Sequence, residues 1–66
     1  MEDFQKRVVV EKKELDAKME KLDHFLYNTT GVDHIVDDIE KQRLEFQLKI
    51  MKSYSMILAD RINNFK

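Results

Sequence analysis

Phe4, Tyr54 and Arg61 are the residues whose types best suit recognition of a small ligand. If the chain folds back on itself, these three side chains come together at the open end of the resulting hairpin. Aromatic faces stack on a nucleotide base, and a guanidinium group forms paired hydrogen bonds with phosphate oxygens. The competing interpretation is structural: Arg61 would pair with an acidic residue near the N-terminus or with a neighbouring subunit.

Two further charged residues, Glu11 and Lys18, stand on rows of otherwise apolar side chains. Burying a charge is costly unless the charge is paired or bound to a ligand, so both are candidate contacts. The structural alternative for Glu11 is an ion pair with a cation such as Lys52. For Lys18 the alternative is an aliphatic stem packed beside Met19, with the ammonium group in water. Lys18 and Phe4 lie about 21 Å apart on a straight helix, too far to share one small pocket within a subunit.

Catalytic chemistry has little support in this sequence. His24 and His34 flank a central loop with several aspartates nearby, but their spacing matches no pattern of metal ligands. There is no glycine-rich phosphate loop and no nucleophile motif, and the chain is too short to enclose a substrate within one subunit. The absence of cysteine excludes disulfides and thiolate metal sites. We expect no enzyme activity, no metal site and no cofactor.

Two segments with helical periodicity flank one interruption, so the fold class predicted for the single domain of residues 1–66 is all-α. The first helix is predicted over about residues 3–27, the loop over 28–34 and the second helix over about 35–65. Asn28 and Gly31 tolerate the backbone of a loop, and Thr30 or Asp33 can cap the second helix. The predicted apolar stripe of the first helix consists of Phe4, Val8, Leu15, Met19, Leu22, Phe25 and Leu26, with Asp16 placed on the opposite face.

The two helices are predicted to pair antiparallel as a hairpin. A loop centred near residues 30–32 would set Leu15 opposite Leu48 and Phe4 opposite Leu58, with Arg61 beside the first residues of the chain. The β-branched run at 8–10 lowers helix propensity, which leaves two alternatives. Residues 1–9 form a segment at an angle, or the helix is straight and its extra valines face a neighbouring subunit.

The second helix carries more apolar surface than one partner helix can cover. One set of rows contains Leu44, Leu48, Met51, Ser55, Leu58, Ile62 and Phe65, and a separate strip contains Phe46, Ile50 and Ile57. A chain of this size usually needs oligomerisation when it lacks disulfides and metal. We therefore predict that the hairpin assembles into a homo-oligomeric helical bundle.

Composition and charge argue against a nucleic-acid or membrane partner. Charged residues make up 38% of the chain, yet the net charge is −1 and the two signs are interspersed. The sequence shows no secretory signal and no apolar run long enough for a transmembrane helix. We expect a cytoplasmic protein.

The two helices resemble a known family of phage proteins. The resemblance lies in the first helix in Phe4-Gln5-Lys6-Arg7-Val8, in the segment from Glu11 to Leu22 and in Phe25. In the second helix it lies in Arg43-Leu44, Gln47-Leu48, Met51, Tyr54, Ile57-Leu58 and Arg61-Ile62. Over nearly the whole chain, the sequence resembles the helical-hairpin domain of anti-CBASS and anti-Thoeris nucleotide sponges.

This resemblance implies a homo-oligomer, often a hexamer, that binds immune second messengers without cleaving them. The implied ligand is a cyclic dinucleotide, a cyclic trinucleotide or a cyclic ADP-ribose isomer. The family's site uses an aromatic residue near the N-terminus, a lysine on the first long helix and, for larger rings, a late arginine. The matching positions are Phe4, Lys18 and Arg61, and Tyr54 would accompany the arginine. Tyrosine is typical at the position of Phe4, so this chain lacks that hydroxyl.

A function of another class remains open. The chain is also typical of a structural or interaction module, a helical bundle that binds protein or structured RNA. RNA binding would require a stripe of lysine and arginine on one exposed face. The lysines of this chain are interleaved with acidic residues instead. A steep salt dependence of RNA binding would support the RNA alternative.

Overall fold

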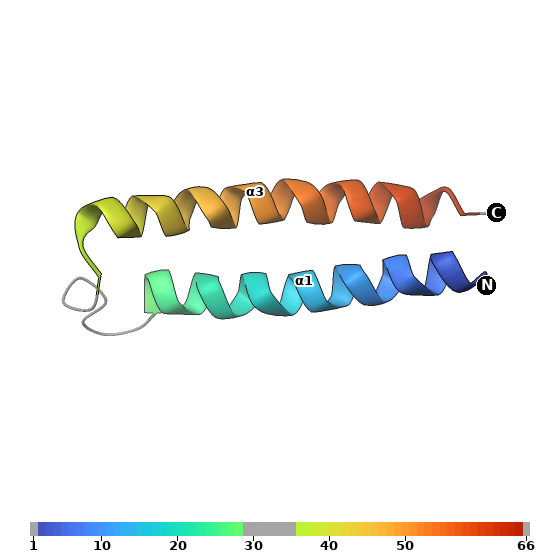
Figure 1. Cartoon of the computed structure of the whole chain (residues 1–66), viewed down its shortest axis with the longest axis horizontal. Helices are drawn as coiled ribbons and strands as arrows, with labels where there is room; N and C mark the ends of the chain where they lie inside the picture. Colours follow the sequence, from blue (N-terminus) through green and yellow to red (C-terminus); the bar gives the residue numbers. More distant parts are fainter. Residues whose placement is uncertain (1, 29–35, 66) are drawn as a thin grey trace.

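Two antiparallel α-helices lying side by side form the whole of the described structure (Figure 1). The computed structural model describes residues 2–28 and 36–65. Helix α1 covers Asp3–Asn28 and helix α3 covers Asp38–Asn63, each with 26 residues. The molecule measures 48 × 16 × 14 Å, and its two termini lie at the same end. The predicted all-α hairpin is confirmed.

Each helix begins with a side chain that accepts a backbone hydrogen bond. At the start of α1, Gln5 Oε1 accepts from the backbone N–H of Glu2 at 2.9 Å. At the start of α3, Asp37 Oδ1 accepts from the N–H of Glu40 at 2.7 Å, the bond expected of an N-cap. Because Asp37 is the cap, α3 begins at Asp38, later than the start predicted near residue 35. The proposed caps at positions 30 and 33 lie outside the described residues.

The core is a single layer of apolar side chains between the two helices. Val8 and Leu26 from α1 and Leu48 and Leu58 from α3 are buried, and Leu58 is 0% exposed. These residues belong to the predicted apolar rows of both helices. Other members of the same rows surround this core and are half-buried: Leu15, Met19, Leu22, Phe25, Leu44, Met51, Ile62 and Phe65.

Helix α1 runs without interruption through Val8, Val9 and Val10. Figure 1 shows it as one continuous helix, with no separate segment at its N-terminus. The alternative of an angled segment over residues 1–9 is therefore wrong. Val8 faces the core, whereas Val10 is 51% exposed on the outside of the helix, as the straight-helix alternative requires.

The register of the two helices differs from the predicted one. Phe4 packs edge-to-face against Phe65, with 6.0 Å between ring centroids and 76° between ring planes. The predicted neighbour, Leu58, lies seven residues earlier, which is about 10 Å along a helix. Further along, Ser55 Oγ donates a hydrogen bond to Asp16 Oδ1 at 2.5 Å. The prediction assumed a loop centred near residues 30–32, whereas α1 ends at Asn28 and α3 begins only at Asp38, so the midpoint between the two helices lies later in the chain.

Candidate functional site

Phe4 lies at the open end of the hairpin with much of its ring accessible. Its edge-to-face contact with Phe65 fixes the ring, and such a pair contributes about 0.5–1.5 kcal/mol beyond the area it buries. The side chain is still 56% exposed. Buried Gln5 anchors the first turn of α1 beneath it through the bond with Glu2. Phe4 is therefore an ordered aromatic surface on which a planar ring can stack.

Lys18 is exposed near the middle of α1. Within residues 2–28 and 36–65 its ammonium group forms no ion pair. The position agrees with the structural alternative of a stem beside half-buried Met19, and it also leaves the ammonium group accessible to an anion. Because α1 is uninterrupted, the separation of about 21 Å between Lys18 and Phe4 holds within one subunit.

Tyr54 and Arg61 lie two turns apart on α3. Tyr54 is 41% exposed, and Arg61 is exposed in the last turn, where the helix dipole favours a cation. In the part of the chain that the structure describes, Arg61 forms no ion pair with Glu2 or with any other acid. The predicted aromatic cluster is not formed as proposed, because the partner of the Phe4 ring is Phe65 rather than Tyr54.

The register nevertheless places all four candidate residues on one side of the hairpin. The Ser55–Asp16 bond sets the neighbouring Tyr54 at nearly the same level as Lys18. With 3.6 residues per turn, both residues project to the side of the hairpin on which Phe4 contacts Phe65. Arg61 projects to this side as well, at a level between Phe4 and Tyr54. We call this side, with Phe4, Arg61, Tyr54 and Lys18 in that order along it, the candidate face.

The opposite side of the hairpin carries the polar contact that fixes the register. Asp16 Oδ2 accepts from Lys12 Nζ at 2.6 Å while Asp16 Oδ1 accepts from Ser55. The hydrogen bonds donated by the Lys12 ammonium and the Ser55 hydroxyl lower the pKa of Asp16 below its ordinary value of 3.8. The prediction that Asp16 faces away from the partner helix is wrong, because its carboxylate reaches across to α3.

Glu11 does not pair with Lys52 as the sequence suggested. The two-turn shift in register places Lys52 nearer the level of Lys18 than that of Glu11. Among the described residues Glu11 has no ion-pair partner. Glu11, a half-buried residue, lines a surface hollow instead.

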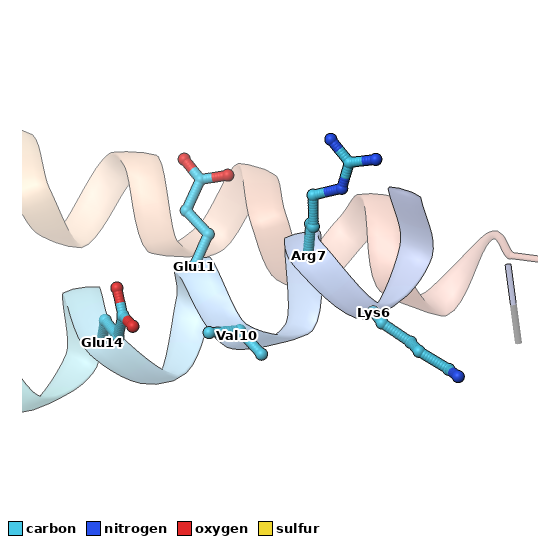
Figure 2. Close-up of a pocket in the computed structure, with 5 residues that line it drawn as sticks. All are labelled: Lys6, Arg7, Val10, Glu11 and Glu14. Atoms are coloured by element: carbon cyan, nitrogen blue, oxygen red, sulfur yellow. The ribbon is translucent and has the colours of Figure 1, made fainter. Parts of the chain in front are cut away.

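This hollow of about 300 Å³ lies on α1 between the levels of Phe4 and Lys18. Figure 2 shows Arg7 and Glu11 projecting to the same side, whereas Lys6 points away from them. All of its lining residues come from one helix, so the hollow has a floor but no opposite wall. Its two cations and two carboxylates give it no net attraction for a phosphate. The lining residues are Lys6, Arg7, Val10, Glu11 and Glu14.

A metal site finds no support in the part of the chain that is described. No three histidine, cysteine or acidic side chains of residues 2–28 and 36–65 are close enough together to hold an ion. His34 and Asp33, which the sequence places near the loop, lie outside these residues. Neither described helix combines the length and the apolar character needed to cross a membrane.

Sequence reasoning missed two contributors to the site, Phe65 and Ser55. Phe65 holds the ring of Phe4, and Ser55 sets the level of Tyr54 relative to Lys18. The signal for Ser55 was a hydroxyl on an otherwise apolar row, because a buried hydroxyl needs a hydrogen-bond partner. For Phe65 there was no separate signal, because its contact depends on the register.

Comparison with known proteins identifies a family for this chain. A family model described as Sequestin matches residues 2–64, which is nearly the whole chain. No curated protein and no solved structure matches it.

Proposed function

The chain belongs to the Sequestin family, and from this premise we propose that it is a sponge for cyclic nucleotide second messengers. It binds a cyclic dinucleotide, a cyclic trinucleotide or a cyclic ADP-ribose isomer and releases it intact. The protein is encoded by a phage and acts in the cytoplasm of the infected bacterium, where sequestration keeps a defence effector inactive. The match over residues 2–64 is the observation that carries this proposal.

The candidate face supplies the chemistry that such a ligand requires. Phe4 stacks on a base, and the accessible ammonium group of Lys18 contacts a phosphate. Arg61 and Tyr54 serve a second site or a larger ring. The ring of Phe4 is held by Phe65 yet more than half exposed, which supports a role in stacking.

The active form is a homo-oligomer, a hexamer by analogy with the family. Phe4 and Lys18 of one copy are too far apart to hold one small ligand, so the site combines residues from two copies. The open hollow between them is consistent with this, because it lacks a second wall. A site built around a two-fold axis also suits the two-fold symmetry of many cyclic dinucleotides.

Isothermal titration calorimetry against a panel of cyclic di- and trinucleotides and cyclic ADP-ribose isomers tests the proposal. We expect tight binding to one of them, with the ligand recovered chemically intact from an oligomer. Loss of intact ligand during incubation would instead indicate an enzyme. An oligomer that binds nothing in the panel would favour the interaction module that binds protein or structured RNA.

Lys18→Ala tests the phosphate contact. Losing one charge-assisted hydrogen bond of about 1.5–3 kcal/mol weakens binding by about 10- to 150-fold. The matched control is Lys13→Ala, which removes an exposed lysine elsewhere on the same helix and leaves the affinity unchanged. Unaltered affinity of Lys18→Ala, with the oligomer intact, would remove Lys18 from the site.

A further inference from the structure

The outer face of α3 carries an apolar stripe that the hairpin itself leaves uncovered. Ile39, Phe46, Ile50 and Ile57 are each more than half exposed, between 54% and 63%. The residues on this face recur at alternating steps of four and three, the spacing by which one helix packs along another. We call this set the outer stripe; its members are Ile39, Arg43, Phe46, Ile50, Ser53, Ile57, Asp60 and Asn64.

We propose that the outer stripe pairs with the outer stripe of a second copy, antiparallel and about a two-fold axis between positions 51 and 52. Phe46 then packs against Ile57 of the second copy, and Ile50 packs over Ser53. The two-fold axis repeats each contact, so each of the eight positions of the outer stripe faces a stripe position of the second copy. The pairing rests on the homo-oligomer of the proposed function and names the surface that forms it.

Charge complementarity selects this arrangement. Arg43 comes opposite Asp60 of the second copy, so both charged members of the stripe are matched by the opposite sign. At the edge of the contact, Arg61 comes opposite Glu40 of the second copy. A parallel arrangement would set Arg43 against Arg43 of the second copy and Asp60 against Asp60 of the second copy, which is repulsive.

Shifting the antiparallel pairing by one heptad gives a poorer match. Phe46 would then face Ile50 of the second copy, which keeps the apolar contact. However, Lys49 would lie beside Lys49 of the second copy, and Asp60 would fall beyond the contact without a partner. The unshifted pairing is the one that uses the whole stripe and joins opposite charges.

The proposed pairing also extends the candidate face. Tyr54 and Arg61 lie along the edge of the outer stripe, on the same side of the hairpin as Phe4 and Lys18. The two-fold axis runs perpendicular to the paired helices, so the candidate faces of both copies end up on one side of the dimer. The second copy thus contributes its own Tyr54 and Arg61 to a continuous surface.

Cysteine cross-linking tests the register, because the native chain contains no cysteine. We expect a mixture of Phe46→Cys and Ile57→Cys proteins to form a disulfide-linked dimer on mild oxidation. Neither variant alone forms one, because like positions are offset by about 16 Å and a disulfide requires Cα atoms within about 7 Å. Cross-linking of Phe46→Cys with Ile50→Cys instead, or indiscriminate cross-linking of every combination, would overturn the proposed register.

A charge exchange tests the same contact without oxidation. Arg43→Asp places two carboxylates opposite each other and is expected to weaken self-association by about tenfold or more, as measured by analytical ultracentrifugation. Adding Asp60→Arg restores it, whereas Lys13→Asp, at an exposed site outside the stripe, has no effect. Failure of the double variant to recover, or a chain that remains a single copy at every concentration, would overturn the inference.

Calorimetry on the same proteins separates this inference from the proposed function. A charge-exchanged oligomer that reassembles but binds no cyclic nucleotide leaves the pairing standing and refutes the sponge. Tight nucleotide binding by a protein that shows neither the expected cross-link nor charge rescue leaves the sponge standing and refutes the pairing.

Discussion

Leu58→Ala tests whether packing between the two helices holds the hairpin together. Leu58 is 0% exposed between α1 and α3, the most completely buried large side chain among the described residues. Truncating a buried leucine to alanine removes its contacts and leaves a cavity, at a cost of about 2–5 kcal/mol. This loss is large for such a small protein.

The total stability sets the scale of the effect. A chain of 66 residues, at about 0.05–0.15 kcal/mol per residue, has a free energy of unfolding of about 3–10 kcal/mol. Leu58→Ala therefore removes between a fifth of this stability and all of it. In a domain of this size each kcal/mol lowers the melting temperature by about 4–8 °C, so we expect a fall of about 8 °C or more.

The neighbouring residue provides a matched control. Ile57 is 58% exposed on the outer stripe, so Ile57→Ala leaves the packing within the hairpin intact and changes its stability by about 0.5 kcal/mol or less. Thermal unfolding followed by circular dichroism over a range of protein concentrations distinguishes the two variants. Leu58→Ala lowers the melting temperature at every concentration, whereas Ile57→Ala acts only where copies associate. A Leu58→Ala protein that melts like the wild type would refute the described packing.

Two smaller predictions concern polar contacts. The pKa of Asp16 is lowered in the folded state, so its carboxylate stabilises the fold above the unfolded pKa near 3.8, and this stabilisation is lost as the pH falls through the folded pKa. The side chain of Asp16→Asn cannot titrate. When the pH is lowered below about 4, the melting temperature of this variant should therefore fall less than that of the wild type. An equal fall in both proteins would contradict the assignment. Asp37→Ala removes the N-cap of α3 and should cost about 0.5–2 kcal/mol in urea unfolding, whereas Asp38→Ala leaves the cap in place.

The inward faces of both helices could be predicted from the sequence because periodicity depends only on residue spacing. The rows containing Val8 and Leu58 repeat every three or four residues, and the structure buries these two side chains. The surplus strip on α3 followed from the same spacing, and Phe46 is indeed 63% exposed on it. Helix ends were harder to predict, because several residues before α3 are good caps; among the described residues, Asp37 forms the capping bond.

The register could not be derived in this way, because helical rows look alike after a shift of seven residues. In the predicted register Phe4 faces Leu58, and in the observed register, two turns away, it contacts Phe65. Both registers give Phe4 an apolar neighbour. Polar contacts break this degeneracy, and the one between Asp16 and Ser55 is specific to the observed register. The sequence contained the signal, a serine on an apolar row, but did not identify its partner.

The register also decides how the proposed binding surface and the proposed assembly surface are divided over the hairpin. With Ser55 beside Asp16, Tyr54 lies level with Lys18, so the side chains suited to a nucleotide share one side while the polar contact occupies the other. The outer stripe of α3 is then left for the proposed second copy, and its edge carries Tyr54 and Arg61. It follows that substitutions within the stripe should alter ligand binding only through assembly. A substitution at Lys18, far from the stripe, should alter binding while the oligomer persists.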